Sequence, residues 1–386
     1  MGIHKLGFMS RHSILCSWLI ITASQSSIMQ PSYPIPIKQA AMPPNNSASW
    51  LMAKQAPNSV IDVAPYTTPS ANELVIKTKA VAVNPADVGI QKLGVLLNDY
   101  PAILGCDVAG EVVEVHPTLA EVYTPGDRVI GAASPLDRKD GKYCYSAFQE
   151  YVVLKVPSIA KIPNGVAYED AVVLPLGINT AASCLFAEKT LGLEVPSIHG
   201  VRSPRGKALL IWGASSSVGA CGVQMATRAG YEVVGVASKR NHEMVKGLGA
   251  SVCFDQSDPT LVDDIATYLS GKEVVGAYGA IASDSALNAM CEILDRCGGR
   301  KLVASVIPGA EQKSTKGVQI VTNFASDIGN SEVGKAIWQW LTIAMEEDWI
   351  KYMPRSEIVG KGLERIQEAI DLLAEGVSAK KLVVSI

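Results

Sequence analysis

The hydrophobic rhythm of the chain changes near Ala167. Before this point, short apolar or alternating runs are separated by turns, and they predict strands at 74–83, 107–115, 128–131 and 148–153. Gly110 permits close backbone approach in the second run, and Pro125–Asp127 forms a turn before the third. The first part of the chain is therefore expected to be irregular, mostly antiparallel β-structure.

After Ala167, apolar runs alternate strictly with amphipathic segments. The runs predict strands at 207–213, 231–237, 251–254, 274–281 and 299–306, and the segments between them predict helices at 218–229, 242–248, 259–269 and 285–294. This alternation is typical of a parallel sheet with helices on both faces. A strand at 318–322, helices at 331–346 and 360–375 and a strand at 381–384 complete the pattern.

The length of 386 residues predicts two domains, at about 100–200 residues per domain. We assign residues 173–329 to an α/β domain with a doubly wound parallel sheet. Residues 49–172 and 330–386 are assigned to a discontinuous, mostly-β domain, because we expect the last two helices and strand to return to the first half. Residues 1–48 are predicted to be a poorly ordered N-terminal extension, since 29–47 is rich in Pro, Ser and Asn.

The first 28 residues leave three interpretations open. Lys5 and Arg11 precede a short apolar stretch at 14–23, which resembles a secretory signal and is shorter than the roughly 20 residues of a membrane span. A mitochondrial presequence is the second interpretation. We favour the third, an upstream extension outside the folded protein, with Met29 and Met42 as alternative starts.

Composition excludes several classes of function. The chain is 48% hydrophobic, and its net charge of −3 gives no general attraction to nucleic acid or to anionic membranes. Its eight cysteines include no C-x-x-C pair and its five histidines stand alone, so the sequence contains neither a zinc ribbon nor a redox dithiol. Cysteines scattered through apolar runs are typical of reduced thiols, which indicates a cytoplasmic protein.

The stretch Leu209–Gly219 combines a buried strand, a Gly/Ser turn and the start of a helix. In a Rossmann-type unit, such a turn lets backbone N–H groups approach a pyrophosphate at the helix N-terminus. We predict a cofactor-binding turn here, in which Gly213 allows the tight turn, Gly219 lets the helix pack on the strand, and small residues lie between them, namely Ser215, Ser216 and Ser217, followed by Val218. The match is partial, because Ser216 stands where the fingerprint has glycine, and a tight turn without a ligand is the alternative.

The end of the next strand indicates which nicotinamide cofactor binds. NAD-binding units usually carry an acidic residue here, which holds the ribose 2′-hydroxyl. This chain has two cations and a hydroxyl instead, which suit a 2′-phosphate, in the run Ser238, Lys239, Arg240 and Asn241. We therefore predict NADPH; the alternative is that Lys239 and Arg240 form only a solvated helix start.

Several short motifs occur in an order that resembles the medium-chain dehydrogenase/reductase superfamily over residues 49–386. These motifs are Val83–Asp87, Gly105–Val112, Pro125–Val129, Leu174–Ala181, the Gly213 turn and Lys380–Val384. The resemblance implies that the α/β domain is a Rossmann-type cofactor domain. It also implies that the discontinuous β domain is GroES-like and contributes to the substrate site.

The zinc enzymes of this superfamily carry Cys at the position of Asn84 and His-Glu at the positions of Cys106 and Asp107. Their second zinc site uses four closely spaced Cys, whereas this chain has only Cys144 in the region after Arg128. Because zinc needs three or four converging ligands, we expect no metal at either site. The chain thus resembles the zinc-free branch, which contains quinone oxidoreductases and fungal trans-acting enoyl reductases.

The resemblance also implies site residues. Asn84 would be the catalytic candidate, Pro85 and Asp87 would lie at the cofactor, Thr180 near the nicotinamide ribose, and Ser305 and Val306 along the nicotinamide; Leu174, Gly177 and Asn179 would line the substrate site. From the residues alone, Asn84 could be simple turn chemistry, and Asp87 could cap or pair locally. The Tyr proton donor of mitochondrial-type enoyl reductases has no counterpart at 92–96, so the proton donor stays open, with solvent as a candidate.

The expected function is an NADPH-dependent, metal-free oxidoreductase that transfers a hydride to an activated C=C bond. Without a Lewis acid, a conjugated carbonyl is the easier acceptor, since it already accommodates the developing charge. A trans-acting enoyl reductase would work with a polyketide synthase. A stand-alone quinone oxidoreductase and a non-catalytic NADPH-binding sensor or structural protein are the alternatives, and a monomer or homodimer is expected by analogy.

Overall fold

The structure is a computed structural model that describes residues 44–281 and 283–386. The interpretations of residues 1–43 lie outside these residues. Strand β1 (Asn46–Leu51) lies between β2 (Val60–Ala64) and β4 (Ala102–Ile103) in an antiparallel sheet. The predicted boundary at residue 48 is therefore too late, because Asn46 already pairs with Ala64 of β2.

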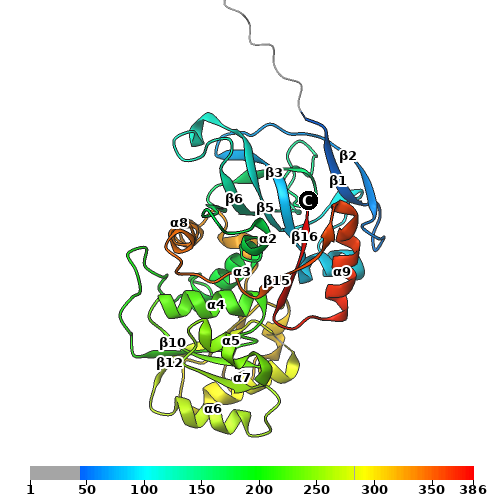
Figure 1. The fold of residues 1–386 in the computed structure, drawn as a ribbon. Coiled ribbons are helices and arrows are strands. Elements are labelled where there is room, and N and C mark those ends of the chain that lie inside the picture. The colour runs from blue at the N-terminus through cyan, green and yellow to red at the C-terminus, as the bar shows by residue number, and fades with distance from the viewer. Residues whose placement is uncertain (1–43, 282) are drawn as a thin grey trace, which may run out of the picture. The chain divides into compact units, whose positions relative to one another are not determined.

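A seven-stranded sheet joins the two ends of the described chain. Its order is β15-β16-β3-β5-β6-β8, with β7 also paired to β3, and all its pairs are antiparallel except β15–β16. Figure 1 shows the red C-terminal strand beside the early strands. The strands are β3 (Glu73–Ala82), β5 (Asp107–Val115), β6 (Arg128–Ala132), β7 (Tyr151–Lys155), β8 (Ile159–Lys161), β15 (Arg355–Lys361) and β16 (Lys380–Ser385).

A second, fully parallel sheet has the order β11-β10-β9-β12-β13-β14. Counted along the chain, this is the order 3-2-1-4-5-6 of the Rossmann fold, and it confirms the predicted doubly wound sheet. The order reverses between β9 and β12, and ligands of such sheets bind at the carboxyl ends of the strands near that point. The strands are β9 (Lys207–Trp212), β10 (Glu232–Ala237), β11 (Val252–Asp255), β12 (Glu273–Gly279), β13 (Leu302–Ser305) and β14 (Gln319–Thr322).

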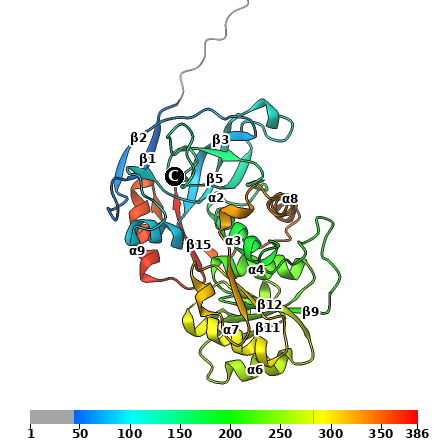
Figure 2. The ribbon, with the colours of Figure 1, turned by 180° about the vertical axis from the view of Figure 1, so that it is seen from behind.

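Helices cover both faces of the parallel sheet. One face packs against α3, α4 and α5, and the other packs against α6 and α7 (Figure 2). The helices are α1 (Pro85–Val88), α2 (Tyr168–Ala171), α3 (Pro175–Leu185), α4 (Ser217–Arg228), α5 (His242–Gly247), α6 (Leu261–Leu269), α7 (Asp284–Arg296), α8 (Glu332–Glu346) and α9 (Ile366–Glu375). Within the described ranges, no helix combines the length and apolarity needed to cross a bilayer.

One hydrophobic core runs between the two large sheets. Its largest cluster includes Ile130 of β6, Leu209 and Ile211 of β9 and Trp338 of α8. Residues on both sides of the predicted domain boundaries at 172/173 and 329/330 therefore share a core, and those boundaries stay predictions.

Two predicted helices begin later than expected. The helix predicted at 360–375 starts only at Ile366, because strand β15 continues to Lys361 and Gly362 has a φ of 97°, which interrupts a helix. The helix predicted from Pro259 begins at Leu261. Here the Asp258 carboxylate accepts hydrogen bonds from the backbone N–H and the hydroxyl of Thr260, and the chain turns before the helix starts.

Candidate active site

In the turn between β9 and α4, the chain passes very close to a residue just after β12 and to its own preceding turn. Gly213 has a φ of 77°, and a Cβ there would lie 2.4 Å from Cγ1 of Ile281. A Cβ on Gly219 would lie 2.2 Å from the carbonyl oxygen of Gly213. Both positions therefore require glycine. Ser216 caps α4, with its Oγ accepting a hydrogen bond from the Gly219 N–H at 3.1 Å.

The start of α4 has the features of an anion site. Ser217 and Val218 are its first two residues, so their N–H groups have no acceptor inside the helix. The Ser217 Oγ is buried without a hydrogen-bond partner. Nδ2 of Asn241 donates to Oγ of Ser215 and to Oγ of Ser378, both at 3.2 Å. The structure thus brings together Ser215 and Asn241, although the sequence analysis assigned them to different phosphates of the cofactor. The start of α4 and these polar side chains fit the phosphates of a dinucleotide.

Two cations follow the carboxyl end of β10, and the charge of Lys239 acts on the Asp258 carboxylate. Lys239 and Arg240 are exposed and form no salt bridge within the described residues. Ser238 Oγ accepts a hydrogen bond from Nε2 of Gln256 at 3.1 Å. The nearby Asp255, at the end of β11, is bound to Ser257, whose N–H and hydroxyl lower the pKa of the carboxyl.

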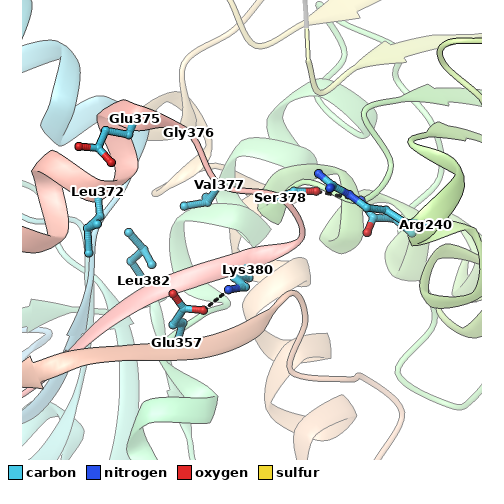
Figure 3. A pocket seen from close by; sticks show the side chains of 10 residues that line it. Arg240, Glu357, Leu372, Glu375, Gly376, Val377, Ser378, Lys380 and Leu382 are labelled. Carbon is cyan, nitrogen blue, oxygen red and sulfur yellow. Dashed lines mark hydrogen bonds and ion pairs between the residues drawn. The ribbon is translucent and has the colours of Figure 1, made fainter.

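A cavity of about 810 Å³ opens beside this end of β10 (Figure 3). Arg240 reaches it from the α/β sheet, and Glu375, Val377 and Ser378 line it at the end of α9 and in the turn that follows. The ion pair between Lys380 and Glu357 forms another part of its wall. Two of the four predicted 2′-phosphate residues, Arg240 and Asn241, thus line a space between the two large sheets.

A buried polar network lies where β3, β5 and β16 meet. Nδ2 of Asn84 donates to Oδ2 of Asp107 at 2.8 Å, and Nζ of Lys381 donates to Oδ1 of Asn84 at 2.5 Å. Lys381 Nζ also lies 2.8 Å from Oδ2 of Asp107, and exposed fractions are 3% for Asn84, 0% for Asp107 and 4% for Lys381. Oδ1 of Asp107 accepts the backbone N–H of Leu176 at 2.6 Å, in the first turn of α3. The charge of Asp107 is thus compensated by Lys381 and by the positive end of α3.

These bonds give two predicted site residues a structural role. The second amide hydrogen of Asn84 points to the carbonyl of Ala82 at 3.3 Å, so both of its donor hydrogens have acceptors in the protein. Asp87 is fully buried and accepts N–H groups from Asn84 at 2.8 Å and Gly105 at 3.1 Å. It caps α1 and secures the turn before β5, and the roles of Asn84 in catalysis and of Asp87 at a cofactor stay predictions. Burial raises the pKa of Asp87 to about 7, against the opposing effect of the bond from Asn84.

A smaller cavity of about 240 Å³ lies between α1, β5 and α3. Of the three predicted substrate residues, only Asn179 lines it. Leu174 is fully buried in the main core, and Gly177 lies where α3 approaches α4, with a Cβ position 2.9 Å from Sγ of Cys221. Leu176 lines the cavity instead, and most of the wall is apolar.

Cys106 also faces this cavity, one residue before Asp107. Burial raises the pKa of its thiol well above the ordinary value, and the neighbouring Asp87 and Asp107 raise it further. The thiol is therefore neutral and a poor nucleophile. None of the seven described cysteines forms a disulfide.

The remaining predicted residues lie at the ends of the parallel strands or on α3. Ser305 ends β13, is fully buried and accepts the N–H of Ile307 at 3.2 Å; Val306 follows and donates its N–H to Gly279 at the end of β12. Thr180 is partly exposed on α3, and Pro85 is exposed at the start of α1. Their roles toward a cofactor stay predictions.

Sequence reasoning missed the part played by Lys381. Its signal was a lysine directly before the apolar run 382–384 of the last strand, in a position that alternates inward with the core residues of that run. In residues 44–281 and 283–386, no group of three or more His, Cys, Asp and Glu side chains converges on a point where a metal ion could bind. The expectation of a metal-free protein stays a prediction.

Comparisons with known proteins agree with this fold. Residues 70–164 match the family "Alcohol dehydrogenase GroES-like domain", and residues 217–341 match "Zinc-binding dehydrogenase". The chain is 39% identical over 372 residues to Dehydrogenase pigH of Monascus ruber, covering 89% of this chain and 100% of the relative. It is 34% identical to Trans-enoyl reductase himH of Aspergillus japonicus, covering 88% and 97%.

Solved structures share the fold at low sequence identity. The CurK enoyl reductase superimposes with a TM-score of 0.68 at 21% identity, over 88% of this chain and 99% of that one. The quinone oxidoreductase from Coxiella burnetii gives a TM-score of 0.63 at 22% identity, over 88% and 99%. A Rossmann sheet joined to a GroES-like β domain defines a nicotinamide-dependent oxidoreductase. The chain belongs to the medium-chain dehydrogenase/reductase superfamily.

Proposed function

We propose that this chain is an NADPH-dependent reductase of activated C=C bonds in α,β-unsaturated carbonyl compounds and that it works without a metal ion. The observation that carries the proposal is the network of Asn84, Asp107 and Lys381, in which Asn84 and Asp107 stand at positions where the zinc relatives carry Cys and Glu. A carboxylate whose charge is already neutralised attracts a further cation only weakly. Lys381 and the first turn of α3 already neutralise the charge of Asp107.

Without a Lewis acid, the substrate must carry its own electron sink, and a conjugated carbonyl does so. The reduced nicotinamide, when bound, supplies a hydride. The β-carbon of the substrate gains this hydride, the π electrons move onto the carbonyl oxygen, and the α-carbon of the resulting enolate takes one proton from water. The substrate is thus reduced by two electrons to a saturated carbonyl compound. The apolar walls of the 240 Å³ cavity suit an acyl chain.

The cofactor would be held along the carboxyl ends of β9, β10 and β13. Gly213 and Gly219, with Ser215–Val218 between them, would hold the pyrophosphate; Lys239 and Arg240, with Ser238 and Asn241, would hold the 2′-phosphate. Thr180 would lie at the ribose and Ser305 with Val306 at the nicotinamide. The feature that favours NADPH over NADH is the pair of exposed cations at the end of β10.

We further propose that the acyl substrate arrives bound to a carrier, from a polyketide synthase, as expected for the trans-acting enoyl reductases that the sequence resembles; two relatives are named trans-enoyl reductases. The cofactor domain would comprise residues 173–329, and residues 330–386 would complete the substrate domain. A quinone acceptor is the competing outcome of the test below.

The first experiment compares NADPH and NADH oxidation with trans-3-nonen-2-one, the N-acetylcysteamine thioester of trans-2-hexenoic acid, and benzoquinone. Reduction of the enone or the thioester with NADPH, to a saturated product, supports the proposal. Reduction of the quinone alone, or NADPH binding with no acceptor reduced, overturns it. Stoichiometric zinc in the active protein would reject its metal-free part.

A charge variant tests the cofactor assignment. We expect Lys239→Gln/Arg240→Gln to raise the KM for NADPH by roughly tenfold for each charged hydrogen bond lost. The KM for NADH should stay unchanged, because NADH has no 2′-phosphate. Lys246→Gln, one helix further on and paired with Glu243, is the matched control that should change neither value.

A further inference from the structure

The smaller cavity is lined by one buried amide whose oxygen accepts a hydrogen bond while its nitrogen donates none to the described residues. Asn179, on α3, is 6% exposed, and its Oδ1 accepts a hydrogen bond from the indole Nε1 of Trp338 at 2.8 Å. An indole N–H can only donate, so the atom facing Trp338 must be the amide oxygen. The orientation of the Asn179 amide is therefore fixed by chemistry, with Nδ2 on the side away from Trp338.

The Nδ2 group of Asn179 is a free donor at the cavity wall. It has no hydrogen-bond partner among the described residues, and the protein does not fully enclose it. Asn179 lines the 240 Å³ cavity, and with Oδ1 bound to Trp338, Nδ2 is the polar atom that its side chain has left for a ligand there. Asn179 also lies three residues after Leu176, on the same side of α3, and the N–H of Leu176 holds Asp107.

The other buried polar side chains of the wall cannot serve this role. The Tyr145 hydroxyl is committed to Oε1 of Glu73 at 2.6 Å. The Cys106 thiol is a weak donor. Asn179 is thus the buried lining residue with a strong donor left over for a ligand.

We propose that Asn179 donates the hydrogen bond that holds the carbonyl oxygen of the substrate and stabilises the negative charge that develops on it. This inference rests on the proposed reduction of an α,β-unsaturated carbonyl compound, in which that oxygen becomes an enolate oxygen. A fixed donor in a buried site favours the charged transition state more than the neutral ground state. Trp338 acts as the positioning residue, because its N–H prevents the amide from flipping.

The decisive variant is Asn179→Asp, which keeps an oxygen for Trp338 and replaces the donor by an acceptor. With trans-3-nonen-2-one and NADPH, kcat should fall by roughly 10²- to 10³-fold, the usual effect of losing one oxyanion donor. Asn179→Leu, which is uncharged, should lose a similar factor. Trp338→Phe should lose less, since the freed amide still presents Nδ2 part of the time.

Trp340→Phe is the matched control. Trp340 lies on the same helix and is 1% exposed like Trp338, but its Nε1 has no hydrogen-bond partner. Its kcat should stay close to that of the unaltered protein. A loss of kcat in this control equal to that of Trp338→Phe would assign the effect to packing and overturn the role of the Trp338 bond.

A binding measurement separates this inference from the proposed function. The carbonyl stretch of bound trans-3-nonen-2-one, labelled with ¹³C at the carbonyl, should move to lower frequency on the unaltered protein and on Trp340→Phe. The shift should disappear with Asn179→Asp and Asn179→Leu. An unchanged frequency in these two variants, or a kcat within about threefold of the original, overturns the inference. If no acceptor is reduced at all, the proposed function fails, while the frequency shift still decides whether Asn179 binds the carbonyl.

Discussion

Lys381 is the residue on which the buried network depends. Its ammonium is 4% exposed and contacts both Asn84 and Asp107, which come from the ends of β3 and β5. A buried charge is tolerated only when a partner and further hydrogen bonds satisfy it. Lys381 and Asp107 satisfy one another, and the Asp107 carboxylate also anchors the first turn of α3. One lysine therefore links the last strand to α3, which lines the smaller cavity.

We expect Lys381→Met to lower the free energy of unfolding by about 3–5 kcal/mol, because Asp107 would stay buried without its counter-charge. Urea unfolding followed by circular dichroism measures this. Lys380→Met is the adjacent control: its pair with Glu357 is about half exposed, and we expect a change of about 0–1 kcal/mol. The double variant Asp107→Asn/Lys381→Met should recover part of the loss. No recovery would show that the lysine stabilises the fold through packing rather than through charge.

Gly219 tests the close approach at the phosphate turn. A Cβ there would meet the carbonyl oxygen of Gly213, which is backbone and cannot move aside. Gly219→Ala should therefore displace the start of α4 and weaken NADPH binding by at least about tenfold, which corresponds to the loss of about one charged hydrogen bond. Isothermal titration calorimetry measures the affinity. Gly247→Ala, whose Cβ meets nothing closer than 4.0 Å, should bind NADPH normally, and equal weakening in both variants would contradict the steric explanation.

For single residues, the sequence predicts which turn positions need glycine better than it predicts which distant side chains form hydrogen bonds. Gly213 and Gly219 are recognisable because strand, turn and helix follow one another directly. Lys381 and Asn84 are 297 positions apart, and nothing in either local sequence specifies the other. The same distance effect explains why Asn84 was expected to act on a ligand: its commitments to Asp107 and Lys381 exist only in the folded chain.

Three helices of the described chain share one kind of beginning. Ser216, Ser283 and Ser331 precede α4, α7 and α8, and each Oγ accepts the N–H three residues further on. An N-cap serine satisfies a backbone donor that the helix itself cannot. Only the N-cap of α4 stands in the predicted phosphate turn. Replacing each cap serine in turn therefore separates an effect on the free energy of unfolding from an effect on cofactor affinity.

Replacing each cap serine by alanine should lower the free energy of unfolding by about 1 kcal/mol in all three variants. Ser216→Ala should in addition lower the affinity for NADPH, because the turn loses the bond that orients its N–H groups. Ser283→Ala and Ser331→Ala should retain the original affinity. Urea unfolding and calorimetry with NADPH give the two quantities, and equal affinities in the three variants would contradict a role for the cap in binding.

The elements predicted correctly are those with a strong, uninterrupted pattern. The six parallel strands alternate with helices, and each buried strand is a continuous apolar run. Strand β15 was missed because its residues are mostly exposed or half-exposed, so no hydrophobic alternation marks it. Strand β15 is held by its pairing to β16. The amphipathic pattern of α9 follows directly, so the sequence predicted a helix that already included the end of β15.

The two large sheets are joined by a common core. Residues of β3, β5 and β6 pack in one cluster with α3, α4 and the near face of the parallel sheet. The far face, covered by α6 and α7, has its own cluster, which contains no residue of the seven-stranded sheet. Since the shared cluster is large and apolar, the two sheets should not unfold independently.

Ile293→Ala tests this cooperation across the whole molecule. Ile293 is fully buried in the far-face cluster on α7, and its truncation should lower the free energy of unfolding by about 2–5 kcal/mol. If the described chain unfolds as one unit, hydrogen–deuterium exchange in urea should show the same lowered midpoint for peptides of β5 and of β12. NADPH at about 100 times its Kd should raise both midpoints together, by about 2.7 kcal/mol in free energy. A lowered midpoint for β12 alone would mean that the shared core does not couple the sheets, because the loss would then stay on the side of the molecule where the cavity was made.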